Sequence, residues 1–318
     1  GVRVADADRA VLPVGSTEQH GPHAPLGTDT RHAESVAAAG AERHDDEVLV
    51  APPVPVGVAE EHRAFDGTLW VAPETLRTYV GDVLASLRHG AGVERVVVVN
   101  GHGGNVGALR EATARATRGD GPYTVPFTWF DSVDAGAVAD AADHERVEMG
   151  HGGPLETALL RHTHPDLVRE DRAAAARDGG AARWGEWVAG VNLAYDSDEF
   201  TDSGAVGDPT TGSAALGAAL LDAAAGGLAR GLTAGATGGA RGPHAAEIRG
   251  DERLGDPAWT DHQGWRYALP EGGVDRGPVD SAREAGLYLL GDWVAGEGRL
   301  HAAIANGLDA GERVAYNV

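Results

Sequence analysis

Residues with the chemistry of metal ligands are concentrated in one short stretch, VLPVGSTEQHGPHAPLGTD, at residues 11–29. Glu18 and His20 are two positions apart, so in extended backbone their side chains point the same way. Asp29 follows the Pro25-Leu26-Gly27 turn, which can bring its carboxylate back to meet them. Two carboxylates and an imidazole suit Zn, Mn or Fe(II) better than Ca or Mg. A lone Glu-x-His pair in a surface loop is more often simply solvated, so the predicted metal site depends on the whole set.

The elements that must position this loop alternate between strand and helix. Strands are predicted at residues 11–14, 48–51, 96–99 and 122–130, and helices at residues 30–41, 73–90, 106–117, from about 154, and 213–228. Thr28 or Asp29 is the expected N-cap of the first helix. Four consecutive valines at 96–99 indicate a strand buried on both faces, as in a parallel sheet. We therefore predict an α/β fold, a three-layer α/β/α sandwich with a mostly parallel sheet, with the active residues at the carboxyl ends of the strands.

A second polar cluster, NGHGGN at residues 100–105, directly follows the valine strand and precedes the 106–117 helix. Glycines before a helix N-terminus can cradle a phosphate. However, the chain has no lysine, and the glycine spacing is neither that of a P-loop nor that of a dinucleotide-binding fingerprint. His102 as a metal ligand is therefore the better interpretation.

The composition excludes several classes of function. The 318-residue chain has no cysteine, so disulfides, thiolate ligands and a cysteine nucleophile are ruled out. Its 48 acidic and 26 basic residues give a formal net charge of -22, which argues against nucleic acid and anionic membrane as partners. This acid-rich, lysine-free composition predicts a halophilic protein, and a GC-rich genome that encodes arginine in place of lysine is the alternative. No apolar stretch approaches the ~20 residues that span a bilayer, and no signal peptide opens the chain, so we expect a cytoplasmic protein.

The metal loop closely resembles the signature of the creatininase family of metal-dependent amidohydrolases, and NGHGGN is similar to the second signature of that family. The resemblance implies that Glu18, His20, Asp29 and His102 are metal ligands, with Asp29 bridging two ions. HGGPLET at residues 151–157 resembles the third motif, which implies that His151 is a catalytic or substrate-polarising residue. GAVGDPTT at residues 204–211 resembles a late glycine-rich motif. The resemblance covers residues 1–232 and implies a homo-oligomer, commonly a hexamer.

The chain departs from part of the family at Gly104, where the creatinine-hydrolysing members have a glutamate that binds the second metal. We assign Glu156 to the second metal, because a two-metal site without it would be poor in ligands. The alternative is that Glu156 only stabilises the N-terminus of its helix. The expected sets are then Glu18, Asp29 and His102 for one ion, and His20, Asp29 and Glu156 for the other. The departure also shifts the expected substrate away from creatinine itself.

Three further residues are candidates for contacts with substrate. A stretch similar to EEHRAFDGT, residues 60–68, borders the active-site cleft in the family, which makes His62 and Thr68 candidates. A plain loop turn accounts for either residue equally well. Trp129, in the last predicted strand, is either core or pocket wall. Residues 177–202 are rich in aromatic side chains and are expected to form a lid or a subunit contact.

The C-terminal quarter does not continue the amidohydrolase pattern. Residues 233–243 are rich in glycine and alanine and are a predicted linker. Residues 244–318 resemble the C-terminal segment of FAD-dependent amine-oxidase-like or renalase-like oxidoreductases, with Gly291-Asp292 at the end of a strand. The phosphate-binding glycine fingerprint of that fold is absent from the sequence, and a fragment cannot rebuild a flavin site by itself, so we do not expect FAD.

These observations predict a metal-dependent amidohydrolase that uses metal-activated water to cleave a non-peptide C–N bond in a small molecule. The substrate would be a creatinine-type cyclic amide or a formamide of a flavin or deazaflavin precursor, with His151 and Glu156 as catalytic residues. One or two divalent ions, Zn, Mn or Fe, are the expected cofactors. Two alternatives stay open. One is a flavin-associated oxidoreductase acting through the C-terminal segment, and the other is a catalytically silent metal-binding scaffold.

Overall fold

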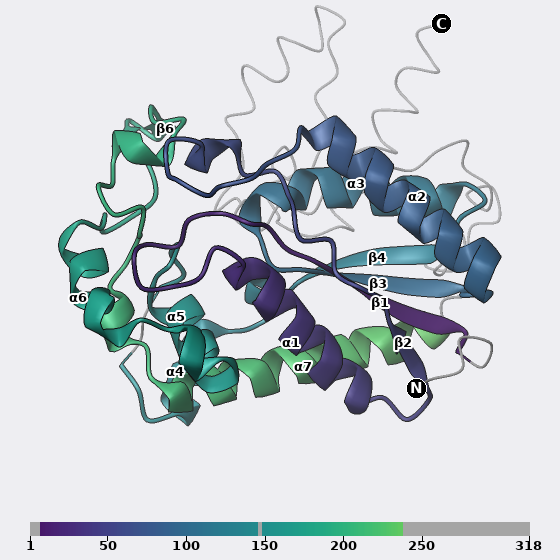
Figure 1. The fold of residues 1–318 in the computed structure, drawn as a ribbon. Coiled ribbons are helices and arrows are strands. Elements are labelled where there is room, and N and C mark those ends of the chain that lie inside the picture. Colours follow the sequence, from purple (N-terminus) through teal and green to yellow (C-terminus); the bar gives the residue numbers. More distant parts are fainter. Residues whose placement is uncertain (1–6, 146–147, 238–318) are drawn as a thin grey trace, which may run out of the picture. The chain divides into compact units, whose positions relative to one another are not determined.

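A four-stranded parallel sheet lies at the centre of the computed structural model, which describes residues 7–145 and 148–237 (Figure 1). The strand order is β2-β1-β3-β4. The strands are β1 (Arg9–Val14), β2 (Val48–Val50), β3 (Arg95–Asn100) and β4 (Tyr123–Thr128). β1 and β3 pair in register from Arg9 opposite Arg95 to Val14 opposite Asn100. Their carboxyl ends therefore meet at one edge, and the predicted α/β fold with a mostly parallel sheet is confirmed.

Helices cover both faces of the sheet (Figure 1). α2 (Pro73–Ala91) and α3 (Val106–Arg118) lie on one face, and α1 (Thr28–Glu42) and α7 (Ala214–Thr237) lie on the other. α4 (Ala135–Ala141), α5 (Pro154–Thr163) and α6 (Glu170–Asp178) are grouped beyond one end of the sheet, and β5 (Trp187–Val188) pairs with β6 (Val191–Asn192) in an antiparallel hairpin. Short 3-10 helices are found at Glu60–His62, Gly103–Asn105, Trp129–Asp131, Pro165–Leu167, Ser197–Glu199 and Pro209–Thr211.

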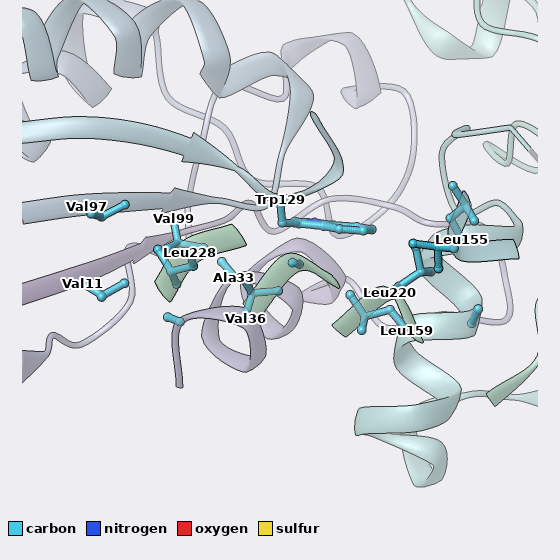
Figure 2. Close-up of a cluster of buried hydrophobic side chains, with 14 of the residues drawn as sticks. Val11, Ala33, Val36, Val97, Val99, Trp129, Leu155, Leu159, Leu220 and Leu228 are labelled. Carbon is cyan, nitrogen blue, oxygen red and sulfur yellow. The ribbon is translucent and has the colours of Figure 1, made fainter. Parts of the chain in front are cut away.

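The alternation of side chains along the central strands divides the core between the two faces. Val11, Val97 and Val99 pack with α1 and α7 (Figure 2), whereas Leu12 and Val98 pack with α2 and α3. Burying each of these side chains contributes about 1.5–3 kcal/mol. The valine-rich strand is therefore buried on both faces, as its sequence predicts.

Two of the predicted element ends are wrong. α1 has Gly27 as its N-cap, with no side-chain hydrogen bond. Thr28 donates its hydroxyl to the Pro25 carbonyl at 2.6 Å, and Asp29 lies 2.9 Å from His20, so neither side chain is free to cap the helix. α7 continues to Thr237, so the predicted linker at 233–243 begins inside this helix.

α7 also corrects an expectation about membranes. Within the described part of the chain, Ala214–Thr233 is one helix that is long and apolar enough to cross a bilayer. Its side chains at Leu216, Leu220 and Leu228 are fully buried in the domain. A core helix of a folded domain passes the same test of length and composition, so this helix is weak support for a membrane span.

The chain divides into two compact units, Gly1–Gly242 and Pro243–Val318. Every described residue belongs to the first unit. The predicted oxidoreductase-like segment at 244–318, including Gly291 and Asp292, lies outside the described residues.

Candidate metal centre

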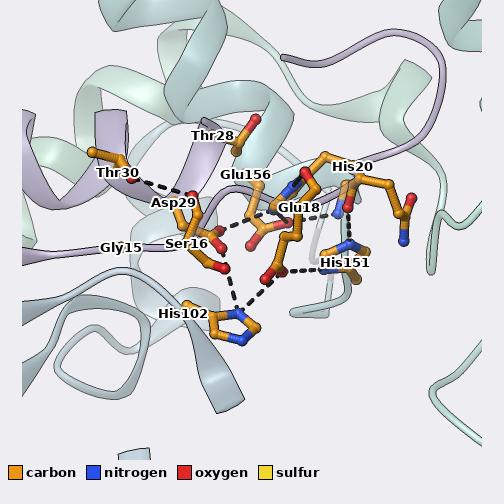
Figure 3. Close-up of polar contacts among 12 residues, drawn as sticks. Gly15, Ser16, Glu18, His20, Thr28, Asp29, Thr30, His102, His151 and Glu156 are labelled. Atoms are coloured by element: carbon orange, nitrogen blue, oxygen red, sulfur yellow. Dashed lines mark hydrogen bonds and ion pairs between the residues drawn. The ribbon is translucent and has the colours of Figure 1, made fainter. Parts of the chain in front are cut away.

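Three chain segments converge at the carboxyl edge of the sheet (Figure 3). The loop after β1 carries Glu18 and His20, and the first turn of α1 carries Asp29. His102 follows β3, and Glu156 lies in the first turn of α5. The parallel register of β1 and β3 explains why the two strand-end loops meet, because both strands end level with one another.

His102 lies against the carboxylates of Glu18 and Asp29. Its Nδ1 is 3.0 Å from Oε1 of Glu18 and 3.3 Å from Oδ2 of Asp29. Its other nitrogen, Nε2, is 2.6 Å from the Val58 carbonyl, which can only accept, so Nε2 carries a proton. Nδ1 is therefore the atom that faces the carboxylates, and a backbone carbonyl fixes the ring in that orientation.

His20 occupies the matching position on the other side of Asp29. Its Nε2 is 2.9 Å from Oδ1 of Asp29 and 3.8 Å from Oε2 of Glu156. Its Nδ1 donates to the carbonyl of Glu18 at 3.2 Å. Asp29 thus presents one oxygen to each imidazole, as a bridging carboxylate would. Glu156 is itself oriented by the Gly152 N–H, which donates to its Oε2 at 2.6 Å.

Buried carboxylate oxygens without partners indicate that a cation belongs in this cluster. Glu18 is 0% exposed, and with the His102 proton on Nε2 neither of its carboxylate oxygens has a hydrogen-bond donor; the same holds for Oδ2 of Asp29. Leaving a charged group buried and unpaired is costly, whereas coordination to a metal removes that cost. The donors are nitrogen and carboxylate oxygen only, a set that suits Zn, Mn or Fe(II). Within the described residues, three groups place their ligand atoms close enough to hold an ion: Glu18, His62 and His151; His20, His151 and Glu156; and Glu18, His20 and Asp29.

The pKa values show how strongly these groups interact. Burial raises the pKa of the Glu18 and Glu156 carboxyls to about 7. Burial alone would lower the pKa of His20, but the neighbouring carboxylates, Asp29 above all, outweigh it and raise that pKa to about 10. The pKa of His102 is raised well above its ordinary value against the same effect of burial, mainly by Glu18. Protons on these two imidazoles thus hold the positive charge that metal ions would otherwise supply.

His151 completes the floor of the site from the start of the α5 segment. Its Nε2 is 2.5 Å from the Gln19 carbonyl and must donate to it, and Nδ1 lies 3.7 Å from Oε1 of Glu18. Burial, then the charges of His20 and His62, keep the pKa of His151 well below its ordinary value. His151 is therefore a neutral imidazole with an unprotonated nitrogen facing the carboxylates.

A pocket of 290 Å³ opens over these residues. Asp29, His102, His151 and Glu156 are part of its lining, together with Trp184. A second hollow of 630 Å³ shares three lining residues with it, namely Met149, Gly150 and Trp184. The space above the candidate metal centre therefore continues beyond the first pocket.

The three residues predicted to contact substrate occupy different environments in the structure. His62 lines the pocket, and its ring stacks on that of His151 with centroids 4.2 Å apart. Thr68 does not line it; its hydroxyl accepts from the backbone N–H of Gln19 at 3.2 Å and so holds the metal loop. Trp129 is 0% exposed and packs in the core against α1 (Figure 2). Its ring is edge-on to that of His32, so the structure does not support a substrate contact for it.

Sequence reasoning assigned no role to two residues of the site and placed a third, Trp184, only in the aromatic-rich segment expected to form a lid or a subunit contact. Glu61 lines the pocket, and its Oε1 is 3.8 Å from Nε2 of His102. Gln19 contacts both His62 and His151. Trp184 packs edge-on to the same two rings, with centroids 5.6 and 6.0 Å away. The positions of Glu61 beside His62 and of Gln19 between Glu18 and His20 were the available signals.

Comparisons with known proteins agree with this geometry. The sequence profile of the family described as Creatininase, creatinine amidohydrolase, matches residues 2–232. The "Mycofactocin precursor peptide peptidase" of Mycobacterium ulcerans (strain Agy99) is 37% identical over 214 residues, 65% of this chain and 77% of that protein. The "Creatinine amidohydrolase" of Pseudomonas putida is 33% identical over 186 residues, 54% of this chain and 70% of that protein. A solved structure titled "Creatininase Mn" has a TM-score of 0.62 and 26% identity, and the match covers 73% of this chain and 93% of that one.

The family profile ends at residue 232, so it gives no support to the oxidoreductase resemblance of residues 244–318. Over the part that does match, the relatives are named as an amidohydrolase and a peptidase, both of which cleave amide bonds. The chain therefore belongs to the creatininase family and is a metal-dependent hydrolase of carbon–nitrogen bonds.

Proposed function

We propose that this chain binds two divalent ions and hydrolyses an amide bond in an extended, peptide-like substrate. The observation that carries the metal site is the set of buried, unpartnered oxygens on Glu18 and Asp29 beside His20 and His102. Glu18, Asp29 and His102 would hold one ion, and His20, Asp29 and Glu156 the other. Ions held there would lower the pKa of a bound water and polarise an amide oxygen.

Gly104 has no side chain to offer the second ion, and the structure leaves no room for one at this position. A Cβ at this position would lie 2.1 Å from the Val58 carbonyl and 2.5 Å from Nε2 of His102. Glu156, whose Oε2 is 3.8 Å from Nε2 of His20, supplies the carboxylate on that side instead. The catalytic unit would lie within residues 1–232.

His151 is the residue best placed to move protons. His151 lines the pocket, and its unprotonated Nδ1 lies 3.7 Å from Oε1 of Glu18, so it can take a proton from the attacking water as the new C–O bond forms. The same nitrogen can then give that proton to the leaving nitrogen as the C–N bond breaks. The products are a carboxylic acid and an amine, and water is the only co-reactant.

The proposed substrate class follows from the shape of the site. A small cyclic amide needs only the 290 Å³ pocket, whereas the adjoining 630 Å³ hollow offers room for a chain that continues past Trp184. The relative named as a precursor peptide peptidase supports a peptide-like substrate. The non-peptide amide predicted from the sequence, either a creatinine-type ring or a formamide, is the competing candidate.

The test is a substrate panel with full-length chain loaded separately with Mn, Zn or Fe. The panel contains creatinine, a formamidopyrimidine and a set of short peptides, and product amines are measured against chelator-treated protein. We expect metal-dependent cleavage of peptides. Turnover of creatinine or the formamide without peptide cleavage would overturn the extended-substrate proposal. Absence of bound metal would overturn the two-ion site.

A further inference from the structure

Gln19 contacts the two imidazoles that stand side by side in the pocket. Its side-chain Nε2 is 2.8 Å from Nδ1 of His62, and its backbone carbonyl is 2.5 Å from Nε2 of His151. The two rings are stacked, with centroids 4.2 Å apart and an interplanar angle of 20°. One residue therefore meets both rings, through its side chain and its main chain respectively.

Two backbone groups fix which way the Gln19 amide points. The Gly21 N–H donates to Oε1 at 3.0 Å, and Nε2 donates to the Gly204 carbonyl at 3.0 Å. A backbone N–H can only donate and a carbonyl can only accept, so the amide cannot be turned round. The second hydrogen on Nε2 is left for His62.

Nδ1 of His62 must therefore accept a hydrogen bond, which places the ring proton on Nε2. The Ser197 hydroxyl is also 3.0 Å from Nδ1, but it is 2.9 Å from the Glu61 carbonyl as well and can rotate to suit either partner. The fixed partner is the amide. Nε2 of His62 lies on the metal side of the ring, 3.5 Å from Oε1 of Glu18.

His62 and His151 thus present opposite hydrogen-bonding groups to the same space: one is a donor and the other an acceptor. His62 directs a protonated nitrogen toward the carboxylate cluster, whereas His151 directs an unprotonated one. Because Nδ1 of His62 already accepts a hydrogen bond, Nε2 could bind a metal only if the ring gave up its last proton, whereas His20 and His102 each keep a proton on the nitrogen that donates to a backbone carbonyl. The arrangement of Glu18, His62 and His151, although close enough to enclose an ion, is therefore not the metal site.

We propose that Gln19 is a positioning residue that holds His62 as a hydrogen-bond donor to the carbonyl oxygen of the scissile amide. This inference rests on the proposed function, because it assigns the donor for the same hydrolysis. As water adds to the carbonyl carbon, negative charge develops on the carbonyl oxygen, and the Nε2–H of His62 stabilises it. His151 carries the proton from water to the leaving nitrogen. A single donor of this kind is worth about 10²–10³ in kcat.

Gly204 gives independent support for the importance of the Gln19 amide. A Cβ at position 204 would lie 1.9 Å from Oε1 of Gln19, and the backbone there has φ +80°, which other residues rarely adopt. Gly204 belongs to the GAVGDPTT segment, which sequence analysis singled out without a role. In the structure this glycine has a role, because its lack of a side chain lets its backbone carbonyl approach and orient the Gln19 amide.

The first test reads the tautomers directly. Full-length chain labelled with ¹⁵N-histidine and loaded with Zn is compared with the Gln19→Met variant by long-range ¹H–¹⁵N NMR. In the wild type, His62 is expected to carry its proton on Nε2 alone. In Gln19→Met, His62 should become a mixture of tautomers, while His151 stays unchanged because its partner is a backbone carbonyl. A proton on Nδ1 of His62 in the wild type, or no change in the variant, would overturn the inference.

The second test measures what the donor does. His62→Phe keeps a ring that stacks on His151 but removes the donor, and His62→Gln restores an amide N–H near the position of Nε2. We expect kcat to fall about 10²–10³-fold in His62→Phe with little change in KM, and to recover in part in His62→Gln. Metal content should equal that of the wild type in both variants.

The outcomes separate this inference from the proposed function. Wild-type kcat in His62→Phe would show that His62 is not the donor, and loss of metal from that variant would show that it is a ligand. If the wild-type chain cleaves no amide in the panel, the proposed function fails. In that case the nitrogen shifts still decide whether Gln19 sets the tautomer of His62.

Discussion

Asp29 is the residue on which both halves of the proposed metal centre depend. Its two carboxylate oxygens face different imidazoles, at 2.9 Å from His20 and 3.3 Å from His102. A group that bridges two ions cannot be replaced by a neighbour, because each ion would lose a charged ligand at once. Each of the other proposed ligands serves only one ion, so a substitution at Asp29 is the most informative single test.

We expect Asp29→Asn to release both ions and to lower metal affinity by more than the ~10–100-fold typical of residues that only support a ligand. Metal per chain, measured by elemental analysis after gel filtration, checks this. Glu61→Gln is the matched control, because Glu61 lies near Nε2 of His102, on the side away from the metal-facing Nδ1. The control should keep its ions. Two ions per chain in Asp29→Asn would refute the bridging role.

The titration of the ligands predicts how metal and pH act together on stability. Without metal, the raised pKa of His20, about 10, gives stability that is complete below its ordinary 6.5 and is lost as the pH rises through about 10. The Glu18 and Glu156 carboxyls, with pKa values raised from 4.5 to about 7, also destabilise the fold as the pH rises through that range. Both effects have the same sign.

The metal-free chain should therefore melt at a lower temperature at about pH 8.5 than at about pH 6. Added Zn or Mn should raise the melting temperature more at the higher pH, because ions then compete with fewer protons for the same ligands. Scanning calorimetry with and without chelator measures both shifts. An equal rise at the two pH values would count against direct ligation by these residues.

At the scale of the elements, glycines let the ligand-bearing segments approach one another. A Cβ at Gly101 would lie 2.1 Å from the backbone carbonyl of Asp29, and one at Gly152 would lie 2.6 Å from that of His20. These contacts join the end of β3 to α1 and the start of α5 to the metal loop. Backbone atoms cannot move aside as a flexible side chain can, so the spacing of these elements depends on the missing side chain.

Gly101→Ala should push β3 and α1 apart, lowering the free energy of unfolding by about 1–3 kcal/mol and weakening metal binding. Gly107→Ala is the control, because a Cβ there meets nothing within 4 Å at the start of α3. It should leave stability unchanged or raise it by up to ~1 kcal/mol, since alanine favours a helix over glycine. Urea titrations compare the two variants. Equal stability of both would show that the β3–α1 approach is not constrained.

At the scale of the whole molecule, the net charge of -22 dominates the behaviour in solution. Repulsion among the acidic residues opposes the compact state, and salt screens it. The halophilic assignment, like the cytoplasmic location and the homo-oligomer or hexamer, stays a prediction. The halophilic assignment can be tested by the dependence of the melting temperature on salt. The oligomeric state can be tested by sedimentation velocity.

Raising KCl from about 0.01 to about 1 M shortens the Debye length from ~30 to ~3 Å, so most of the stabilisation should occur within that range. The melting temperature of the metal-loaded chain should rise there and then level off. A rise confined to higher concentrations would indicate salting-out rather than screening. A melting temperature that does not respond would favour a GC-rich genome as the source of the arginine-for-lysine exchange.

The sequence by itself determined the layered α/β fold and identified the candidate metal ligands that the structure brings together. Hydrophobic runs and helical periodicity placed β1, β3, α2 and α3, because these patterns are local and reflect which faces are buried. The first motif contains Glu18, His20 and Asp29 within twelve residues of chain, so their proximity follows from a single loop. His102 was predictable because a polar residue directly after a buried parallel strand lies at the carboxyl edge of the sheet.

Only the tertiary structure decided how the rest of the chain meets these residues. Tertiary packing buries Trp129 in the core rather than in the pocket wall. It also brings Gly204 to the amide of Gln19, 185 positions away in the sequence. It also set the tautomer of His62, which depends on a partner more than forty residues away. Local pattern carries no record of such contacts, because they arise when elements that are far apart in the sequence pack together.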